Sequence, residues 1–174
     1  MKQSTKDEAR KWIVTIIQIL MILGFFWIIS LGFQSIGTAE DATAYILCKP
    51  GDYINARSTA AYGKNVIGRL ETGDEIQVDG KTKNGFAHCT NPTFEDDECW
   101  VYTGYIVFDK PQWMNGRTAT VVSNYKLAER KSMTGTVNRW LKPGTEIQVF
   151  WWTEEWCVTN RGFVMTKYIE LDGE

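Results

Sequence analysis

The chain has 174 residues, four cysteines and one histidine, and its formal net charge is −2 at pH 7. Residues 40–174 carry 15 lysines and arginines against 19 aspartates and glutamates. Nucleic-acid-binding proteins normally present a basic face, so this charge balance speaks against nucleic acid as a partner.

The N-terminal part predicts a membrane anchor. Residues 1–11 form a basic tail, and residues 12–34 form an almost continuous apolar run without a charged residue. About 20 apolar residues suffice for a helix to cross a hydrocarbon core of about 30 Å, so the run predicts a transmembrane helix or signal-anchor, followed by a linker over residues 35–43. Basic residues precede the run and acidic residues follow it, which places the N-terminus in the cytoplasm and the C-terminus outside.

Two alternatives to the anchor remain open. A signal peptide cleaved near Ala39 would leave the rest of the chain secreted, and it also fits a basic start followed by an apolar run. The run is longer than is usual for such a signal, which favours the anchor. A buried helix of a soluble protein is the least favoured reading.

The part after the linker contains one phrase twice, GDEIQV at residues 73–78 and GTEIQV at residues 144–149. Apolar and polar residues alternate in each copy after a glycine, which predicts a strand that follows a turn. The core positions of these strands are predicted to be Ile76, Val78, Ile147 and Val149.

The similarity between the copies extends beyond the phrase. Residues 54–57 match residues 127–130, and residues 100–106 match residues 163–169. Most of the length difference falls in an acidic loop at residues 91–98, where an insertion is easily tolerated. The sequence therefore predicts an all-β fold with two tandem modules, at residues 44–110 and 115–172, each a small barrel or sandwich of short strands.

All four cysteines follow the apolar run, where an oxidising exterior would allow disulfides. Four cysteines can pair in three ways. The favoured pairing joins Cys89 to Cys99, which flank the acidic loop, and Cys48 to Cys157. The absence of a Cys-x-x-Cys motif speaks against a redox or zinc site.

Several motifs of the first copy resemble the bacterial Src-homology-3 (SH3b-type) domain. They are Asn55-Ala56-Arg57-Ser58, the turn from Ile67 to Asp74, the pair Gly85-Phe86 and the closing segment from Trp100 to Ile106. The second copy departs from the pattern at Ala128, at Trp140 and at Trp156-Cys157-Val158. The resemblance implies two small SH3-like barrels that bind cell-wall peptides or glycans, or that dock a partner.

Domains of this family are often appended to wall-cleaving enzymes, but the sequence predicts no enzyme here. The one histidine, His88, is adjacent to Cys89 in a predicted strand, where neighbouring side chains point to opposite faces. The acidic loop lacks the ligand spacing of a calcium site. We therefore expect no catalytic residue, no metal and no cofactor.

Aromatic residues are the main candidates for ligand contact. The resemblance implies a groove near the first long loop that uses Tyr53, Asn55, Tyr62 and Trp100. In the second copy, alternation places Val149 and Trp151 on one face of a strand and the aromatic pair Phe150 and Trp152 on the other face. One pair must then be exposed as a ligand platform or must pack between the copies. The candidate ligand-binding residues are Tyr53, Asn55, Arg57, Tyr62, Trp100, Phe150 and Trp152.

These expectations combine into one hypothesis of function. The chain is predicted to be a membrane-anchored, outward-facing, non-enzymatic protein that recognises cell-wall (peptidoglycan) peptide or glycan. The alternative is a structural subunit that binds another protein of an envelope or transfer apparatus.

Overall fold

The computed structural model describes residues 41–91, 94 and 98–173. The predicted basic tail and the predicted membrane segment at residues 12–34 lie outside these residues. Within the described ranges, no helix is both long enough and apolar enough to span a membrane.

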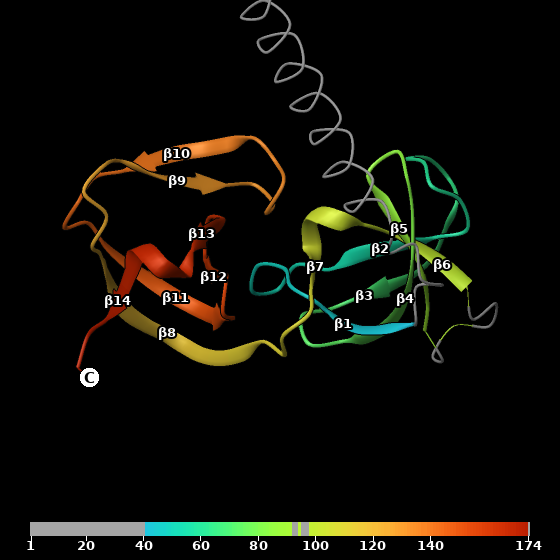
Figure 1. Cartoon of the computed structure of the whole chain (residues 1–174), viewed down its shortest axis with the longest axis horizontal. Helices are drawn as coiled ribbons and strands as arrows, with labels where there is room; N and C mark the ends of the chain where they lie inside the picture. The colour runs from blue at the N-terminus through green and yellow to red at the C-terminus, as the bar shows by residue number, and fades with distance from the viewer. Residues whose placement is uncertain (1–40, 92–93, 95–97, 174) are drawn as a thin grey trace, which may run out of the picture. The chain divides into compact units, whose positions relative to one another are not determined.

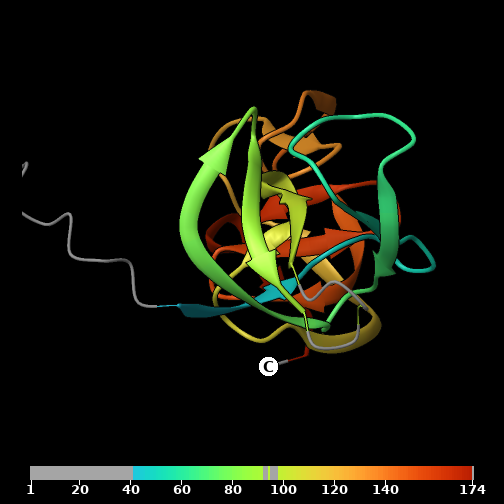
Figure 2. The ribbon, with the colours of Figure 1, turned by 90° about the vertical axis from the view of Figure 1, so that its right-hand side faces the viewer.

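The first sheet has seven strands and occupies residues 42–107, here called the first module (Figure 1). A 3-10 helix, η1 (Thr103–Tyr105), precedes its last strand. The strands are β1 (Ala42–Ile46), β2 (Ile54–Arg57), β3 (Val66–Leu70), β4 (Glu75–Lys83), β5 (Phe86–Thr90), β6 (Glu98–Tyr102) and β7 (Ile106–Val107). The β4–β5 hairpin curves along one side of the module (Figure 2).

The second sheet also has seven strands and occupies residues 112–171, the second module. It too has a 3-10 helix, η2 (Thr166–Tyr168), before its last strand. The strands are β8 (Gln112–Val121), β9 (Leu127–Arg130), β10 (Val137–Leu141), β11 (Glu146–Trp152), β12 (Trp156–Thr159), β13 (Phe163–Met165) and β14 (Ile169–Leu171).

The two sheets share one strand order. It is β3-β2-β6-β5-β4-β1-β7 in the first and β10-β9-β13-β12-β11-β8-β14 in the second, so each strand of the first module has its counterpart seven strands later. All the pairings are antiparallel. The all-β class is therefore confirmed, but no hydrogen-bonded pairing between the described edge strands closes either sheet into a ring.

The repeated phrase forms the start of β4 and of β11, beside β1 and β8 respectively. Ile76, Val78, Ile147 and Val149 are all buried, as predicted. The first two belong to the core of the first module and the last two to the core of the second. A third apolar cluster joins the modules and contains Leu47, Val107, Met133, Val158 and Phe163.

Directly after the phrase, where the two sequences diverge, each copy contains a bulge. The β4 register shifts between Val78 and Thr82, where Gly80 has a φ of 75° that a side chain would disfavour. The β11 register shifts between Val149 and Trp151.

The bulge in β11 corrects the predicted alternation of its aromatic residues. Val149 lies in the second core, and Trp152 packs against that core as well, whereas Trp151 packs against the cluster that joins the modules. A bulge adds one residue to one strand, and this reverses the faces of all later side chains.

The predicted disulfides are not present, because all four cysteines are free thiols. Cys89 and Cys99 do face each other across β5 and β6, but their sulfur atoms are 2.8 Å apart and a disulfide bond is about 2.05 Å long. Cys48 donates to the carbonyl of Asp52, while Cys157 lies in the second core. Burial raises the pKa of Cys157 to about 12, so it remains a protonated thiol.

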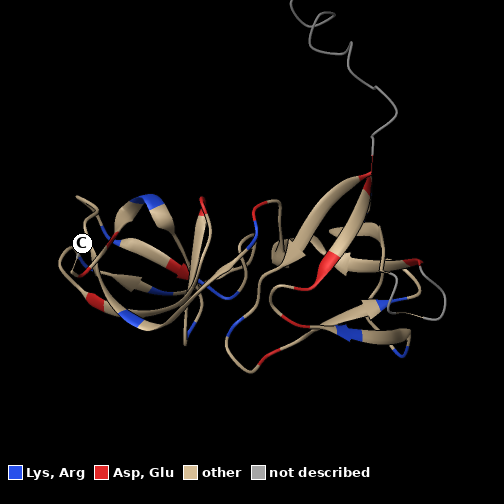
Figure 3. Ribbon diagram, turned by 90° about the horizontal axis from the view of Figure 1, so that it is seen from below, with Lys and Arg blue, Asp and Glu red and all other residues tan. Residues whose placement is uncertain are grey.

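Charged residues of both signs are interspersed along the two sheets (Figure 3). Two charged residues are buried within the described ranges, Arg57 and Glu129; the side chain of Glu129 is fully buried and pairs with Arg139.

Candidate functional site

Four of the predicted ligand-binding residues line one cavity of the first module. These are Tyr53, Asn55, Arg57 and Tyr62, and the cavity has a volume of about 220 Å³. Ile54, Phe86, Tyr102 and Tyr105 complete its lining. We call this cavity the tyrosine pocket.

Strand β2 and the loop after it build one side of the tyrosine pocket. Arg57 ends β2 and is buried, and its Nη1 donates to the carbonyl of Gly63 at 3.1 Å and to Oδ1 of Asn65 at 3.0 Å. Asn65 in turn donates to the carbonyls of Thr59 and Ala61. These bonds hold the loop at residues 58–65 in one conformation.

Arg57 therefore supports the pocket more than it offers a charge to a ligand. Its guanidinium lies 5.3 Å from the ring centroid of Tyr62, within the range of a cation–π contact. Arg130 is its counterpart in the second module and donates to the carbonyl of Gly135 in the same way. Since both copies keep this bond, the arginine orders the loop and positions Tyr62.

The other side of the tyrosine pocket is a row of aromatic rings. Tyr62 meets Phe86 edge-on with 5.2 Å between centroids, Phe86 meets Tyr102 at 5.7 Å, and Tyr102 lies 6.1 Å from Tyr105. Burial raises the pKa of Tyr105, so its hydroxyl stays protonated and can donate a hydrogen bond. Tyr62 is 72% exposed despite these contacts.

Two further groups complete the chemistry of the tyrosine pocket. Tyr53 is exposed, and the guanidinium of Arg69 lies 4.2 Å from its ring centroid. The side-chain amide of Asn55 is half-buried and has no hydrogen-bond partner within the described part of the chain. Aromatic faces with a few polar groups suit a sugar ring or a short extended peptide.

The structure places Trp100 outside this pocket. The ring of Trp100 packs against that of His88, with 4.9 Å between the centroids and 59° between the ring planes. His88 Nδ1 lies 2.9 Å from a carboxylate oxygen of Asp79, and His88 Nε2 lies 3.9 Å from Glu98. This cluster joins the bulge of β4 to β5 and β6.

Phe150 and Trp152 also lie apart from the tyrosine pocket, in the second module. Phe150 is 6.0 Å from Trp113, which is half exposed and meets Trp151 at 4.7 Å. Trp152 packs against the second core. The structure thus brings together four of the seven candidates and leaves the other three elsewhere.

Sequence reasoning missed Phe86, Tyr102 and Tyr105 as pocket residues. Alternation places Tyr102 on the same face of β6 as Trp100, but only Tyr102 lines the pocket, so the strand pattern alone does not select it. Tyr105 is the last residue of the 3-10 helix η1, and the alternation of a strand does not extend into such a helix. Among the described residues, no three His, Cys, Asp or Glu side chains are arranged to hold a metal ion.

No protein-family model matches the sequence, and no curated protein matches it. Two solved structures from Trichomonas vaginalis align with the chain, each at 15% identity. NlpC2 aligns with a TM-score of 0.33 over 77% of this chain and 49% of that chain. NlpC1 aligns with a TM-score of 0.34 over 78% of this chain and 47% of that chain. The chain thus spans about half the length of these proteins.

Proposed function

We propose that the protein is a non-enzymatic, outward-facing and membrane-anchored binding protein, and that its SH3-like modules recognise cell-wall peptide or glycan. The observation that supports this proposal is the convergence of Tyr53, Asn55 and Tyr62 on one pocket. Tyr53 stands directly before β2, Asn55 lies in β2 and Tyr62 lies in the loop after it, where the family resemblance implies a groove.

Binding in the tyrosine pocket would rest on area and orientation. The faces of Tyr53 and Tyr62 supply apolar contact at a small entropic cost, since each side chain has two rotatable bonds. The Asn55 amide and the tyrosine hydroxyls fix the orientation of a ligand through hydrogen bonds. The pocket is small, so it accommodates one sugar ring or one to two peptide residues at a time.

The alternative function is a structural subunit that binds another envelope protein through the same modules. Trp113 favours it, because this side chain is half exposed beside Trp151, and exposed aromatic side chains often mark protein interfaces. In that case the isolated wall is not a ligand.

Sedimentation with purified cell wall tests the proposal. The full chain, kept in a mild detergent, should sediment with the wall, and Tyr62→Ala should weaken the apparent affinity about tenfold, which corresponds to about 1.4 kcal/mol. Tyr62→Phe keeps the aromatic ring, so it should lose less affinity for the wall than Tyr62→Ala does.

Tyr125→Ala is the matched control, because Tyr125 is 82% exposed and lies in the second module outside the tyrosine pocket. It should bind the wall as the unmodified protein does. A lack of sedimentation, or an equal loss in the Tyr62 and Tyr125 variants, would refute the proposal and favour the structural subunit.

A further inference from the structure

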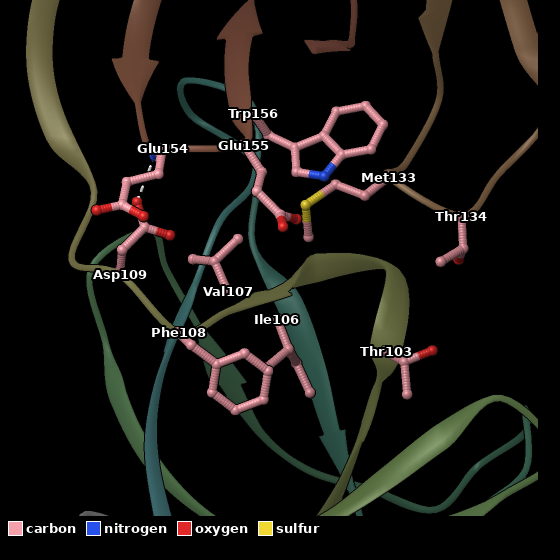
Figure 4. Close-up of a pocket in the computed structure, with 10 residues that line it drawn as sticks. All are labelled: Thr103, Ile106, Val107, Phe108, Asp109, Met133, Thr134, Glu154, Glu155 and Trp156. Carbon is pink, nitrogen blue, oxygen red and sulfur yellow. Dashed lines mark hydrogen bonds between the residues drawn. The ribbon is translucent and has the colours of Figure 1, made fainter. Parts of the chain in front are cut away.

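A second, larger cavity lies where the two modules meet. It has a volume of about 570 Å³, and Figure 4 shows its ten lining residues. The first module supplies Thr103, Ile106 and Val107, and the segment between the modules supplies Phe108 and Asp109. The second module supplies Met133, Thr134, Glu154, Glu155 and Trp156. We call it the junction cavity; it shares no lining residue with the tyrosine pocket.

The backbone around the junction cavity is held in place from both modules. The amide of Glu154 donates to Asp109 Oδ2 at 2.5 Å, and the amide of Met133 donates to the carbonyl of Gly104 at 3.0 Å. The carbonyl of Glu155 accepts from the amide of Thr166. Backbone hydrogen bonds of the fold therefore hold the walls of the cavity in place.

The charges in the junction cavity are of one sign. Asp109, Glu154 and Glu155 are acidic, and none of the described residues that line it is basic. The side chains of Glu154 and Glu155 are exposed and have no hydrogen bond or ion pair within the described part of the chain. Figure 4 shows the Glu155 side chain pointing into the same space as Met133.

An apolar hollow adjoins the junction cavity and has a volume of about 180 Å³. The two share Thr103, Ile106 and Phe108, and the hollow adds Val78, Gly80, Lys81, Thr82 and Ala87. Phe108 is 68% exposed at the boundary between them. A large aromatic side chain that is left in water at such a boundary offers contact area to a ligand.

We propose that the junction cavity and the adjoining hollow together bind an extended basic peptide segment of a partner protein. An apolar side chain of the peptide occupies the hollow against Phe108. A lysine or arginine of the same peptide enters the junction cavity, where Glu154 and Glu155 neutralise its charge and the Trp156 ring contacts it. Unpaired carboxylates repel an acidic peptide, so the charge gives specificity as well as affinity.

The test measures fluorescence anisotropy of labelled peptides with the full chain in detergent. The probes are glycine-based octapeptides that contain one leucine and two lysines, with one, two or three glycines between the leucine and the first lysine. Reference peptides carry glutamate in place of each lysine. At least one lysine peptide should bind at least tenfold more tightly than its glutamate reference.

Variants then locate the binding. The double substitution Glu154→Gln and Glu155→Gln should weaken binding of that lysine peptide about tenfold or more, and Phe108→Ser should weaken it too. The matched controls are the double substitution Glu146→Gln and Glu170→Gln, which changes the net charge equally at exposed positions, and Tyr125→Ser. Both controls should bind as the unmodified protein does.

The outcomes separate this proposal from the one for the tyrosine pocket, because Tyr62→Ala should leave binding of the lysine peptide unchanged. The proposal is overturned if no lysine peptide binds more tightly than its glutamate reference. It is also overturned if the control charge variant loses as much affinity as the Glu154 and Glu155 variant.

Discussion

Asp79 is the most heavily hydrogen-bonded carboxylate at the bulge of β4. Its Oδ1 accepts from the amide of Lys81 at 3.0 Å, and its Oδ2 contacts Lys81 Nζ and His88 Nδ1. Desolvation acts to raise the pKa of Asp79, but the hydrogen bonds from Lys81 and His88 outweigh it and hold the pKa well below its usual range. The charged form therefore stabilises the bulge.

This pKa predicts how acid affects stability. An unfolded aspartate titrates near pH 4, so a depressed folded pKa adds stability that is complete above about pH 4 and is lost as the pH falls further. The protein should lose more free energy of unfolding between pH 6 and pH 3 than Asp79→Asn does, as measured by urea unfolding. Glu146→Gln, at an exposed strand position, should behave as the unmodified protein. If Asp79→Asn and the unmodified protein lost the same free energy of unfolding between pH 6 and pH 3, the lowered pKa of Asp79 would not be the source of the acid sensitivity.

Single residues differ in how much of their role could be predicted. Ile76 and Ile147 could be assigned to cores, because burial follows the period of two that a strand imposes. Arg57 is predicted to contact a ligand and lines the tyrosine pocket, but its hydrogen bonds to the loop at residues 58–65 are not predicted by the sequence. Those hydrogen bonds depend on where the loop returns in space, which the local pattern does not contain.

The bulges in β4 and β11 could not be predicted from the sequence for a related reason. The partner of β11 contains Asn115 and Gly116, both with positive φ, next to the shift of register. Such a pair indicates a break in a strand, but its effect on Trp151 and Trp152 follows only when β8 is known to pair with β11. A strand can be predicted from its own residues, whereas its register depends on the strand with which it pairs.

Equivalent positions of the β9–β10 pair and of its counterpart β2–β3 are filled by different kinds of side chain. Arg139 lies opposite Glu129, and Thr159 also donates to Glu129 at 2.6 Å. The corresponding positions of the first module are Ala56 and Gly68. A Cβ on Gly68 would lie 2.3 Å from the Phe94 ring, so an aromatic side chain fills the space there.

This comparison predicts that an apolar pair can replace the ionic one. Arg139→Met alone should lower the free energy of unfolding by roughly 2 kcal/mol or more, since it leaves a buried carboxylate without its cation. Adding Glu129→Met should recover most of that loss in urea unfolding. Lys131→Met, at an exposed position nearby, should change stability by no more than about 0.5 kcal/mol. A double variant less stable than Arg139→Met would show that the pair itself is needed.

The two modules share an apolar cluster, so we expect each to stabilise the other. Residues 40–174 form one compact unit. Modules of about 60 residues bury too little surface to be more than marginally stable alone. The cluster that joins them supplies further burial, and Tyr105 meets Phe163 edge-on at 5.8 Å across the junction. The same junction orders the cavity between the modules, so coupling and binding would share one structural basis.

Met133 provides the test of this coupling, because it is buried in the joining cluster and its amide bonds to η1. Met133→Ser should lower the free energy of unfolding by about 2–4 kcal/mol and let the modules unfold separately. Hydrogen exchange read by mass spectrometry should show both sheets opening together in the unmodified protein and at different free energies in the variant. Met114→Ser removes contacts with the second core only, so it should lower stability while the sheets still open together. If both sheets still opened together in Met133→Ser, Met133 would not be the residue that couples the modules, and other residues of the junction would carry the coupling.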